Sequence, residues 1–223
     1  MGFLLSMEVY MANLGLEVSG TYAFFLRPER QKEMESYDFI TPLAAKGIFE
    51  SIYWHAGVKY IFDEFRILSP VQMEPVTIRR HSAWGESDQV LRFLALKNVH
   101  YLILGHCTFD GNQRVNASVG KVKGIFKSRA SKQKAFRTPY FGIPEFTCQY
   151  SWVDPASDLS RFTPIKRSGD LGLMLYDLRN ENGRVFPRWF HAGIKNGIIS
   201  MKNITVESGK GTKIVNKGSG DYR

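Results

Sequence analysis

A chain of 223 residues with 43% hydrophobic and 23% charged residues has the composition of a folded protein and room for one full domain plus a small second one. Thirty Lys and Arg against 21 Asp and Glu give a formal net charge of +9, which points to a polyanionic partner. The two cysteines, Cys107 and Cys148, form no CxxC pair or Cys/His cluster, which argues against a structural zinc site and fits a reducing cytoplasm. The apolar stretch at residues 1–6 is too short for a membrane span. We therefore expect a cytoplasmic protein without metal, cofactor or membrane association.

Runs of alternating or continuous apolar residues predict the strands of a main domain. They lie at residues 14–20, 58–68, 90–109 and 145–152. Residues 22–30 are predicted as a loop or strand edge. Residues 70–88 contain two prolines and are predicted as an irregular hairpin insertion.

Two helices are predicted between these strands. Thr41 followed by Pro42 is typical of a helix start, a hydroxyl N-cap with proline at the first position, and this helix is expected to run to about Gly57. The second helix is indicated by an apolar stripe with spacings of four, three and four: Val115, Val119, Val122 and Phe126. The order β-α-β-β-α-β predicts an α+β fold of the ferredoxin-like or RNA-recognition-motif type. Sheets of RNA-recognition domains present aromatic and basic residues to unstacked bases.

The chain is predicted to divide into four parts. Residues 1–13 form an N-terminal extension and residues 14–153 the main domain. Residues 154–206 form a small antiparallel β appendage. Its two predicted strands are 171–178 and 185–190. The Gly-, Ser- and Lys-rich residues 207–223 are expected to be a disordered basic tail.

Positive charge is concentrated in one segment of the chain. Between Gly111 and Pro144 there are eight basic residues and no acidic one, so a bound phosphate backbone explains the run better than a solvated helix face. The eight are Arg114, Lys121, Lys123, Lys127, Arg129, Lys132, Lys134 and Arg137. Five further basic residues are candidate RNA contacts: Arg27, Arg30, Lys46, Arg79 and Arg80. Ordinary surface charge is the alternative for Lys127 and Arg129 and for the basic residues of the first loop and the hairpin insertion.

A series of short motifs follows a fixed order along the chain. The strongest spans the predicted first helix, where Ser36-Tyr37-Asp38 and Thr41-Pro42 precede AKGIFESIYW at residues 45–54. The others are residues 22–29, 96–101, 125–129, 139–142, 145–146 and 170–177. In order and spacing, this series resembles the CRISPR-associated Cas-five family, type I-C branch, over about residues 14–201.

The resemblance implies a fold, an activity and a set of partners. The fold is an RNA-recognition-like domain with a small β appendage, and the activity is metal-independent cleavage of CRISPR repeat RNA at the base of a hairpin. The ribose 2′-OH would attack the adjacent phosphate. The protein would then remain on the 5′ handle of the guide RNA (crRNA) within a Cascade surveillance complex, beside its backbone and large subunits. Double-stranded DNA is kept as a further candidate partner.

The working groups of this family are a Tyr in the first helix and a Lys-His pair that opens the second. By this resemblance, Tyr53 and Lys121 are the candidate catalytic residues. A phenol becomes a usable base near cations that favour its anion, and a Lys near the scissile phosphate stabilises charge in the transition state. A plain core position is the alternative for Tyr53, and simple membership of the basic run is the alternative for Lys121.

The family His is missing, because Val122 stands at its position and also fits the apolar stripe. Loss of a general acid or base typically lowers a rate by about 10²–10⁴. Candidate replacements are Lys123, in part, and His55, His81 and His106. Three hypotheses remain: an active repeat-RNA endoribonuclease that becomes a Cascade subunit, a non-catalytic subunit that caps the 5′ handle, and an unrelated RNA-recognition module. The motif spacing disfavours the third, and we favour the first.

Overall fold

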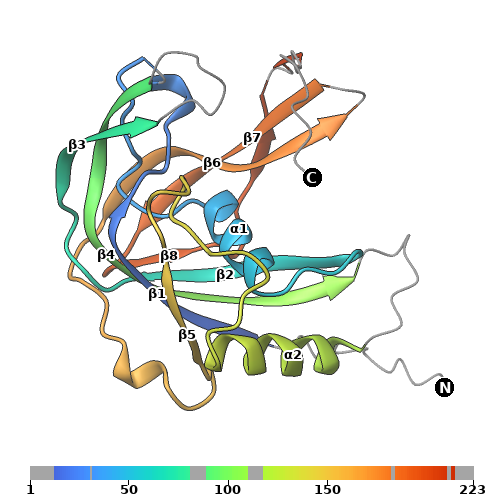
Figure 1. Cartoon of the computed structure of the whole chain (residues 1–223). Helices are drawn as coiled ribbons and strands as arrows, with labels where there is room; N and C mark the ends of the chain where they lie inside the picture. The colour runs from blue at the N-terminus through green and yellow to red at the C-terminus, as the bar shows by residue number, and fades with distance from the viewer. Residues whose placement is uncertain are drawn as a thin grey trace.

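The structure is a computed structural model that describes residues 13–30, 32–80, 89–109, 118–181, 184–209 and 212–213 (Figure 1). In chain order the elements are β1 (Asn13–Ala23), α1 (Pro42–Ile52), β2 (Val58–Ile67), β3 (Met73–Arg80), β4 (Gln89–Phe109), α2 (Val119–Ser131), β5 (Gln149–Val153), β6 (Gly169–Glu181), β7 (Arg184–Ile194), β8 (Ile198–Ser200), β9 (Val206–Ser208) and β10 (Thr212–Lys213). Short 3-10 turns lie at Pro28–Arg30 and Leu159–Arg161. The described chain is therefore mostly antiparallel sheet with two α-helices, which is the predicted α+β class.

The four strands predicted for the main domain correspond to β1, β2, β4 and β5, and all four lie in one antiparallel sheet. The strand order is β5-β1-β4-β2-β8, and β3 also pairs with β4. β1 lies along β4 and carries β5 on its other edge. β2 lies on the other side of β4, with a register shift between Phe62 and Glu64.

The segment predicted as an irregular hairpin insertion does form a hairpin, and only its predicted irregularity is wrong, because its two described strands pair in continuous antiparallel register. β3 pairs with residues 89–96 of β4, and the rest of β4 pairs with β1 and β2. Pro70 lies before the strand, and Pro75 lies within β3, which pairs with β4 alone among the described strands. Proline is tolerated on such an edge strand because its missing N–H can face away from the ladder. β4 changes partners near Asn98, which has a φ of 51°, a left-handed conformation that asparagine adopts more readily than most residues.

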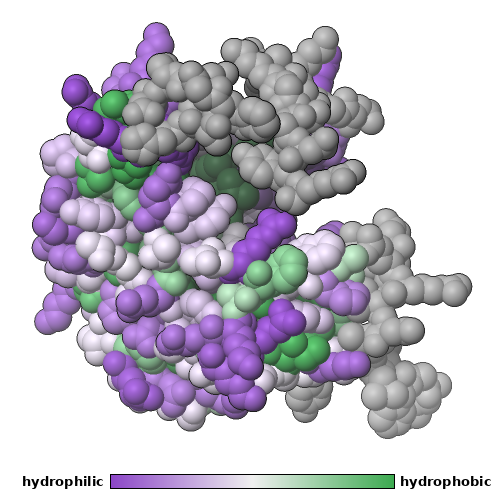
Figure 2. Space-filling model, in the orientation of Figure 1, coloured by the Kyte–Doolittle hydropathy of each residue, from purple (hydrophilic) through white to green (hydrophobic). Residues whose placement is uncertain are grey.

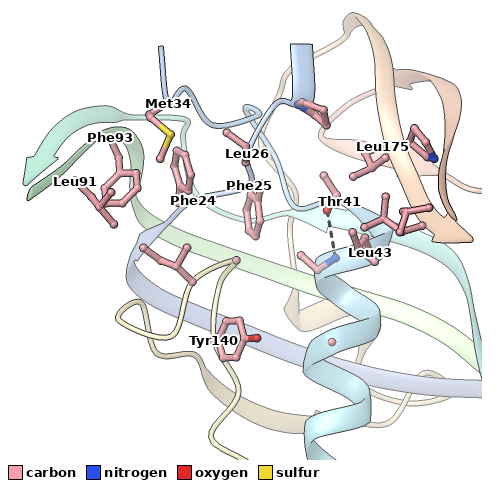
Figure 3. Close-up of a pocket in the computed structure, with 18 of the residues that line it drawn as sticks. Phe24, Phe25, Leu26, Met34, Thr41, Leu43, Leu91, Phe93, Tyr140 and Leu175 are labelled. Carbon is pink, nitrogen blue, oxygen red and sulfur yellow. Dashed lines mark hydrogen bonds between the residues drawn. The ribbon is translucent and has the colours of Figure 1, made fainter. Parts of the chain in front are cut away.

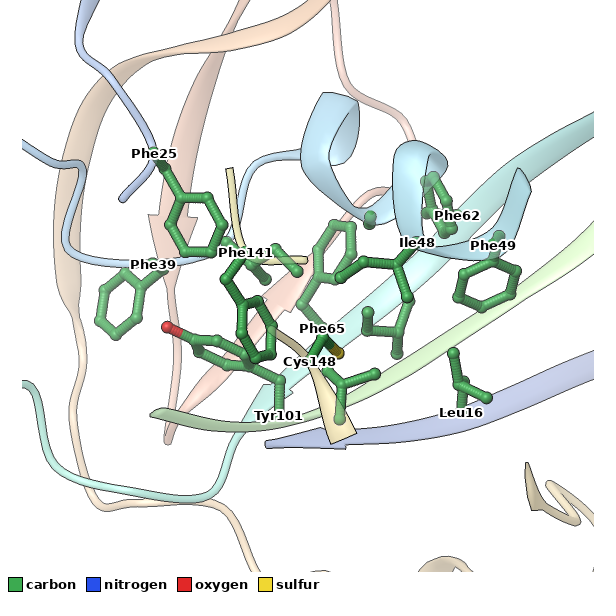
Figure 4. Packing of buried hydrophobic residues seen from close by; sticks show 14 of the residues in the cluster. Leu16, Phe25, Phe39, Ile48, Phe49, Phe62, Phe65, Tyr101, Phe141 and Cys148 are labelled. Atoms are coloured by element: carbon green, nitrogen blue, oxygen red, sulfur yellow. The ribbon is translucent and has the colours of Figure 1, made fainter. Parts of the chain in front are cut away.

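Both helices pack on the same face of the main sheet. Phe49 of α1 stacks on Phe126 of α2 with ring centroids 5.0 Å apart, and both rings contact Tyr60 of β2. Figure 4 shows Ile48 and Phe49 of α1 facing the strands, with Leu16 of β1 beneath them. Burial of each such side chain contributes about 1.5–3 kcal/mol to folding, so these contacts fix the two helices against each other.

The start of α1 is as predicted, and its end is not. Thr41 is the N-cap, its hydroxyl accepts a backbone N–H three residues on at 3.2 Å, and Pro42 takes the first position. The helix ends at Ile52 instead of near Gly57, and Tyr53 is an extended C-cap. The carbonyls of Ser51 and Ile52 accept hydrogen bonds from the Phe136 N–H and the Arg129 guanidinium. Because these groups take the place of N–H donors from a further helical turn, the helix can end here.

α2 starts at Val119, with Ser118 as N-cap. Its buried side chains are Val122, Phe126 and Ala130. The predicted stripe is thus confirmed at its centre, whereas Val115 lies outside the described residues. Neither α1 nor α2, the two α-helices of the described ranges, is long and apolar enough to cross a membrane.

The sheet face opposite the helices is partly covered by the linker between β5 and β6. Leu102 of β4 pairs with Glu17 on this face and is fully buried. The Leu159 carbonyl of the linker accepts a hydrogen bond from the Arg66 guanidinium of β2 at 3.3 Å. The linker therefore crosses from the β5 edge towards β2, and less of this face is open to bases than in an uncovered RNA-recognition sheet.

The C-terminal part forms a second antiparallel sheet in the order β10-β7-β6, with β9 on β7. In Figure 1 the β6–β7 hairpin and the β3–β4 hairpin rise on the same side of the molecule, with α1 between them. The predicted disordered tail begins inside β9 and includes β10, so the prediction is wrong for these paired residues. Residues 214–223 and the predicted extension at 1–12 lie outside the described residues.

Candidate functional site

Tyr53 lies at the C-terminal end of α1 and is 8% exposed. Its carbonyl accepts a hydrogen bond from the Tyr60 hydroxyl at 2.6 Å. Burial raises the pKa of Tyr60, so that phenol stays protonated and remains the donor. The buried side-chain polar atoms that lack a partner within the described residues are on Tyr37 and Trp152, and the Tyr53 hydroxyl is not among them. None of the hydrogen bonds among the described residues is made by the Tyr53 hydroxyl.

Arg129 of α2 contacts two residues at the end of α1. Its guanidinium carbon lies 5.2 Å from the centroid of the Tyr53 ring. Its Nη1 donates to the Ile52 carbonyl at 3.0 Å. A cation over an aromatic face contributes roughly 0.5–1 kcal/mol where exposed and more where desolvated. Arg129, predicted as a phosphate contact, is therefore also a positioning residue for Tyr53.

The chain after α2 turns back against the end of α1. The N–H groups of Phe136 and Arg137 donate to the Ser51 carbonyl at 2.7 and 3.2 Å. The Arg137 guanidinium carbon lies 5.7 Å from the centroid of the Phe136 ring. Lys132, Lys134 and Arg137 are all exposed. Three predicted RNA contacts thus lie on the segment that packs beside Tyr53.

The other candidate catalytic residue, Lys121, is exposed in the first turn of α2. No contact among the described residues joins it to Tyr53. Arg129, which does contact Tyr53, lies eight residues further along the helix, about 12 Å along its axis. Lys123 is half-buried near Lys121. The structure therefore places Tyr53 next to the cation at the end of α2 and leaves Lys121 near the start of that helix.

Val122 is fully buried in the hydrophobic core. It shares the inward side of α2 with Phe126 and Ala130. The side chain that the resemblance compares with a catalytic His therefore points into apolar packing, away from solvent.

Of the three histidines considered as replacements, His55 lies two residues after Tyr53, and its side chain is exposed. It lies in the turn between α1 and β2, with Nδ1 2.7 Å from the Ala56 carbonyl oxygen. Because a carbonyl can only accept, Nδ1 carries the proton, and Nε2 of the neutral ring is left as an acceptor. His106 is buried with Nδ1 3.0 Å from a carboxylate oxygen of β2. His81 lies outside the described residues.

Most other predicted RNA contacts are engaged by acidic side chains of the protein. The ion pairs are Arg27–Asp38 (3.4 Å), Arg30–Glu35, Lys46–Glu50 (3.7 Å), Arg80–Glu145 (2.6 Å) and Lys127–Asp154 (3.8 Å). Hydrogen bonding from Arg80 lowers the pKa of Glu145. Arg79 is exposed. Exposed pairs contribute only about 0–1 kcal/mol, so they can open, but they offer less charge to a ligand than the exposed cations after α2.

An apolar groove of about 940 Å³ runs along α1. Its walls come from α1, both hairpins and the segment after β1, as Figure 3 shows. Figure 2 shows the hollow with hydrophobic side chains at its back. Ser51 and Tyr140 belong to the lining, so the groove reaches the end of α1. Among the predicted RNA contacts, Arg80 also lines it.

A polar cluster on the opposite sheet face was not predicted. Glu17 accepts a hydrogen bond from the Ser151 hydroxyl at 2.9 Å, and its other oxygen lies 2.8 Å from Nε2 of His100. These residues come from three neighbouring strands, and no motif spacing in the sequence connects them. Within the described ranges, no group of three or more His, Cys, Asp or Glu side chains is arranged to hold a metal ion.

Comparison with known proteins places this chain. A family model described as CRISPR-associated protein (Cas_Cas5), of the Cas5d type, matches residues 14–202. The chain belongs to the Cas5 family of CRISPR-associated proteins. A relative from Mannheimia succiniciproducens, named CRISPR pre-crRNA endoribonuclease Cas5d, is 32% identical over 225 residues, which cover 90% of this chain and 100% of the relative. A relative of the same name from Thermus thermophilus is 29% identical, over 86% of this chain and 92% of that one.

Two solved structures share the fold of this Cas5 chain. One is SMU1763c from Streptococcus mutans, described as functionally uncharacterized, with a TM-score of 0.69 and 19% identity over 86% of this chain and 93% of that one. The other is a CRISPR-associated protein with a TM-score of 0.68 and 21% identity over 86% of this chain and 92% of that one. At these identities the likeness concerns the fold.

Proposed function

We propose that this Cas5 protein binds CRISPR repeat RNA and cleaves it without a metal ion. The observation that carries the proposal is the end of α1, where Tyr53 lies under Arg129 and His55 follows two residues later. The names of both Cas5d relatives, pre-crRNA endoribonuclease, support the same activity. We extend the proposal to a ferredoxin-like core, because the order β5-β1-β4-β2 with helices after β1 and β4 is consistent with it.

In the proposed reaction the ribose 2′-oxygen attacks the adjacent phosphorus. The 2′-oxygen–phosphorus bond forms as the phosphorus–O5′ bond breaks, which leaves a 2′,3′-cyclic phosphate and a 5′-hydroxyl. His55 takes the 2′-OH proton at Nε2, because Nδ1 is already a donor to the Ala56 carbonyl. The Tyr53 hydroxyl gives a proton to O5′. Arg129, which lies over the Tyr53 ring, stabilises the negative charge on the phosphate in the transition state.

We further propose that the product RNA stays bound at its 5′ handle and that the protein acts in the cytoplasm as a Cascade subunit. The exposed cations Lys132, Lys134 and Arg137 support product retention, because phosphate contacts of this kind need no particular sequence. Contact with the backbone and large subunits, and with double-stranded DNA, belongs to the same proposal.

A second candidate function is a Cascade subunit that caps the 5′ handle without cutting. One observation favours it. Val122 is fully buried at the position where the resemblance expects His, so α2 contributes no imidazole there. In this alternative the end of α1 binds RNA but transfers no proton.

Cleavage of the repeat hairpin RNA from the protein's own CRISPR array separates the two functions. Purified protein is incubated with this RNA in EDTA, in parallel with RNA that carries 2′-deoxy at the cut site. We expect a single cut that the 2′-deoxy substitution abolishes. Tight binding without a cut would contradict the endoribonuclease and establish the capping subunit. A cut that the 2′-deoxy RNA also receives would contradict attack by the 2′-OH.

A further inference from the structure

The exposed large aromatic side chains of the described surface come from two segments near the end of α1. Three large aromatic residues of the described chain are exposed: Trp54 by 61%, Phe136 by 70% and Tyr140 by 42%. Trp54 directly follows Tyr53, and the other two lie in the segment after α2. We call these three residues the aromatic platform. Single exposed apolar residues are ordinary, but three rings from two segments at one helix end call for a ligand.

The backbone segments that carry the three rings lie near the end of α1. The Phe136 N–H donates to the Ser51 carbonyl at 2.7 Å. Trp54 follows Ser51 by three residues, a reach of at most about 11 Å, so the backbones of Trp54 and Phe136 lie within roughly 15 Å of each other. Ser51 and Tyr140 line the same groove, and Figure 3 shows Tyr140 beside α1.

Cations lie on the segments of the aromatic platform, and two acidic residues that border these segments, Glu50 and Glu145, are paired with Lys46 and Arg80. Neither residues 51–62 nor residues 118–144, the two segments that carry the rings, contain an Asp or Glu. Lys132, Lys134 and Arg137 are exposed between or beside the rings in sequence, and Arg137 lies over the Phe136 ring. The surface therefore combines flat apolar faces with unneutralised positive charge.

We propose that the aromatic platform stacks on unpaired nucleobases of the RNA, while the neighbouring cations hold its phosphates. The inference rests on the proposed RNA binding and adds the class of ligand, which is single-stranded nucleotides and not a duplex. Every base has a π-face, so stacking on aromatic side chains tolerates any sequence. A duplex keeps its bases stacked on each other and cannot offer them to protein rings.

A protein partner fits the same surface less well. A protein that buried Lys132, Lys134 and Arg137 would need a charged or hydrogen-bonding partner for each, because an unpaired buried charge is costly. A nucleic-acid strand supplies a phosphate with every nucleotide. Single-stranded RNA can therefore contact both kinds of group, with its bases on the rings and its phosphates on the cations.

Binding of two probes tests the inference. One probe is a single-stranded oligouridylate, and the other is the same ribose-phosphate chain without bases. The variants are Trp54→Leu, Phe136→Leu and the double variant, since leucine keeps apolar bulk and removes the ring. Trp54→Phe is the conservative variant, and Leu173→Ala is the matched control at an exposed apolar residue of β6. Thermal unfolding verifies that each variant is folded.

We expect the wild-type protein to bind the oligouridylate more tightly than the base-free chain, by about 5- to 150-fold for each stacked base. Each leucine variant loses part of this preference, and the double variant binds the two probes almost equally. Trp54→Phe and Leu173→Ala keep the preference. Equal binding of the two probes by the wild-type protein would overturn the inference, as would leucine variants that retain the full preference. Cleavage of the repeat hairpin is measured separately, so a protein that prefers the oligouridylate but does not cut sustains the inference and contradicts the proposed activity.

Discussion

Tyr53 and Trp54 are neighbours in the sequence and have opposite surroundings. Tyr53 is 8% exposed beneath Arg129, whereas Trp54 is 61% exposed. Helical periodicity cannot assign these environments, because α1 ends at Ile52 and both residues lie beyond it. The family motif identified Tyr53 from the sequence. The exposure of Trp54 depends on how α2 and the segment after it pack against α1, which no local pattern reveals.

Replacement of His55 tests the assignment of proton transfer at the residue scale. We expect His55→Ala to slow cleavage by about 10²–10⁴, because it removes a general base, and to leave affinity for repeat RNA within a few-fold. Added imidazole should restore part of the rate, which a purely structural role would not allow. The measurement is single-turnover cleavage with and without imidazole. His191→Ala, at an exposed histidine of β7, is the control and should cut normally. Cleavage by His55→Ala at the wild-type rate would remove His55 from the mechanism.

At the scale of elements, α2 was largely predictable on its inward side. The spacing of Val119, Val122 and Phe126 indicated one stripe, and Val122 and Phe126 are fully buried. The partners of its outward side were not predictable. Arg129 meets Tyr53 and Ile52 across a long stretch of sequence, and such a pairing leaves no periodic signal. The hairpin of β3 and β4 was predicted, but its two prolines suggested an irregular structure, whereas Pro70 lies before β3 and Pro75 lies in an edge strand.

Restoring the family residue in α2 tests the packing of this element. We expect Val122→His to destabilise the protein by about 1–3 kcal/mol, because the imidazole would lose hydrogen bonds to water in an apolar site. Cleavage should not increase. Urea unfolding and single-turnover cleavage measure the two effects. Lys123→His is the matched control, because it places an imidazole on a half-buried neighbour with little loss of stability. A Val122→His protein that is as stable as the wild type and cuts faster would show that position 122 faces the RNA.

At the scale of the whole molecule, the net charge predicted the sign of the partner but not the surface that receives it. Arg27 and Arg80, both predicted RNA contacts, are held by Asp38 and Glu145. Lys132, Lys134 and Arg137, which follow the helical part of α2, are exposed and available to bind phosphates. The α+β class was also predictable, whereas the linker after β5 that covers Leu102 was not, since loops leave no periodic pattern.

Charge reversal tests which surface meets the RNA. We expect Lys132→Glu with Lys134→Glu to weaken binding of repeat RNA and to flatten its salt dependence. For single strands, the slope of log K against log salt should fall by about 0.7 for each phosphate that the variant no longer neutralises. Titrations at several salt concentrations measure this slope. The matched control, Lys195→Glu with Lys202→Glu, makes the same charge change at exposed lysines on either side of β8 and should bind more like the wild type. Equally weakened binding in both double variants would mean that net charge, and not this surface, governs binding.

Tyr53→Phe tests the proposed site most directly, because it removes one hydroxyl and keeps the ring beneath Arg129. Cleavage and binding of the repeat hairpin RNA are measured side by side for this variant, with Tyr176→Phe on β6 as control. We predict that Tyr53→Phe abolishes cutting and binds within a few-fold of the wild type, and that Tyr176→Phe impairs neither. Unchanged cutting by Tyr53→Phe would contradict a cleavage site at the end of α1.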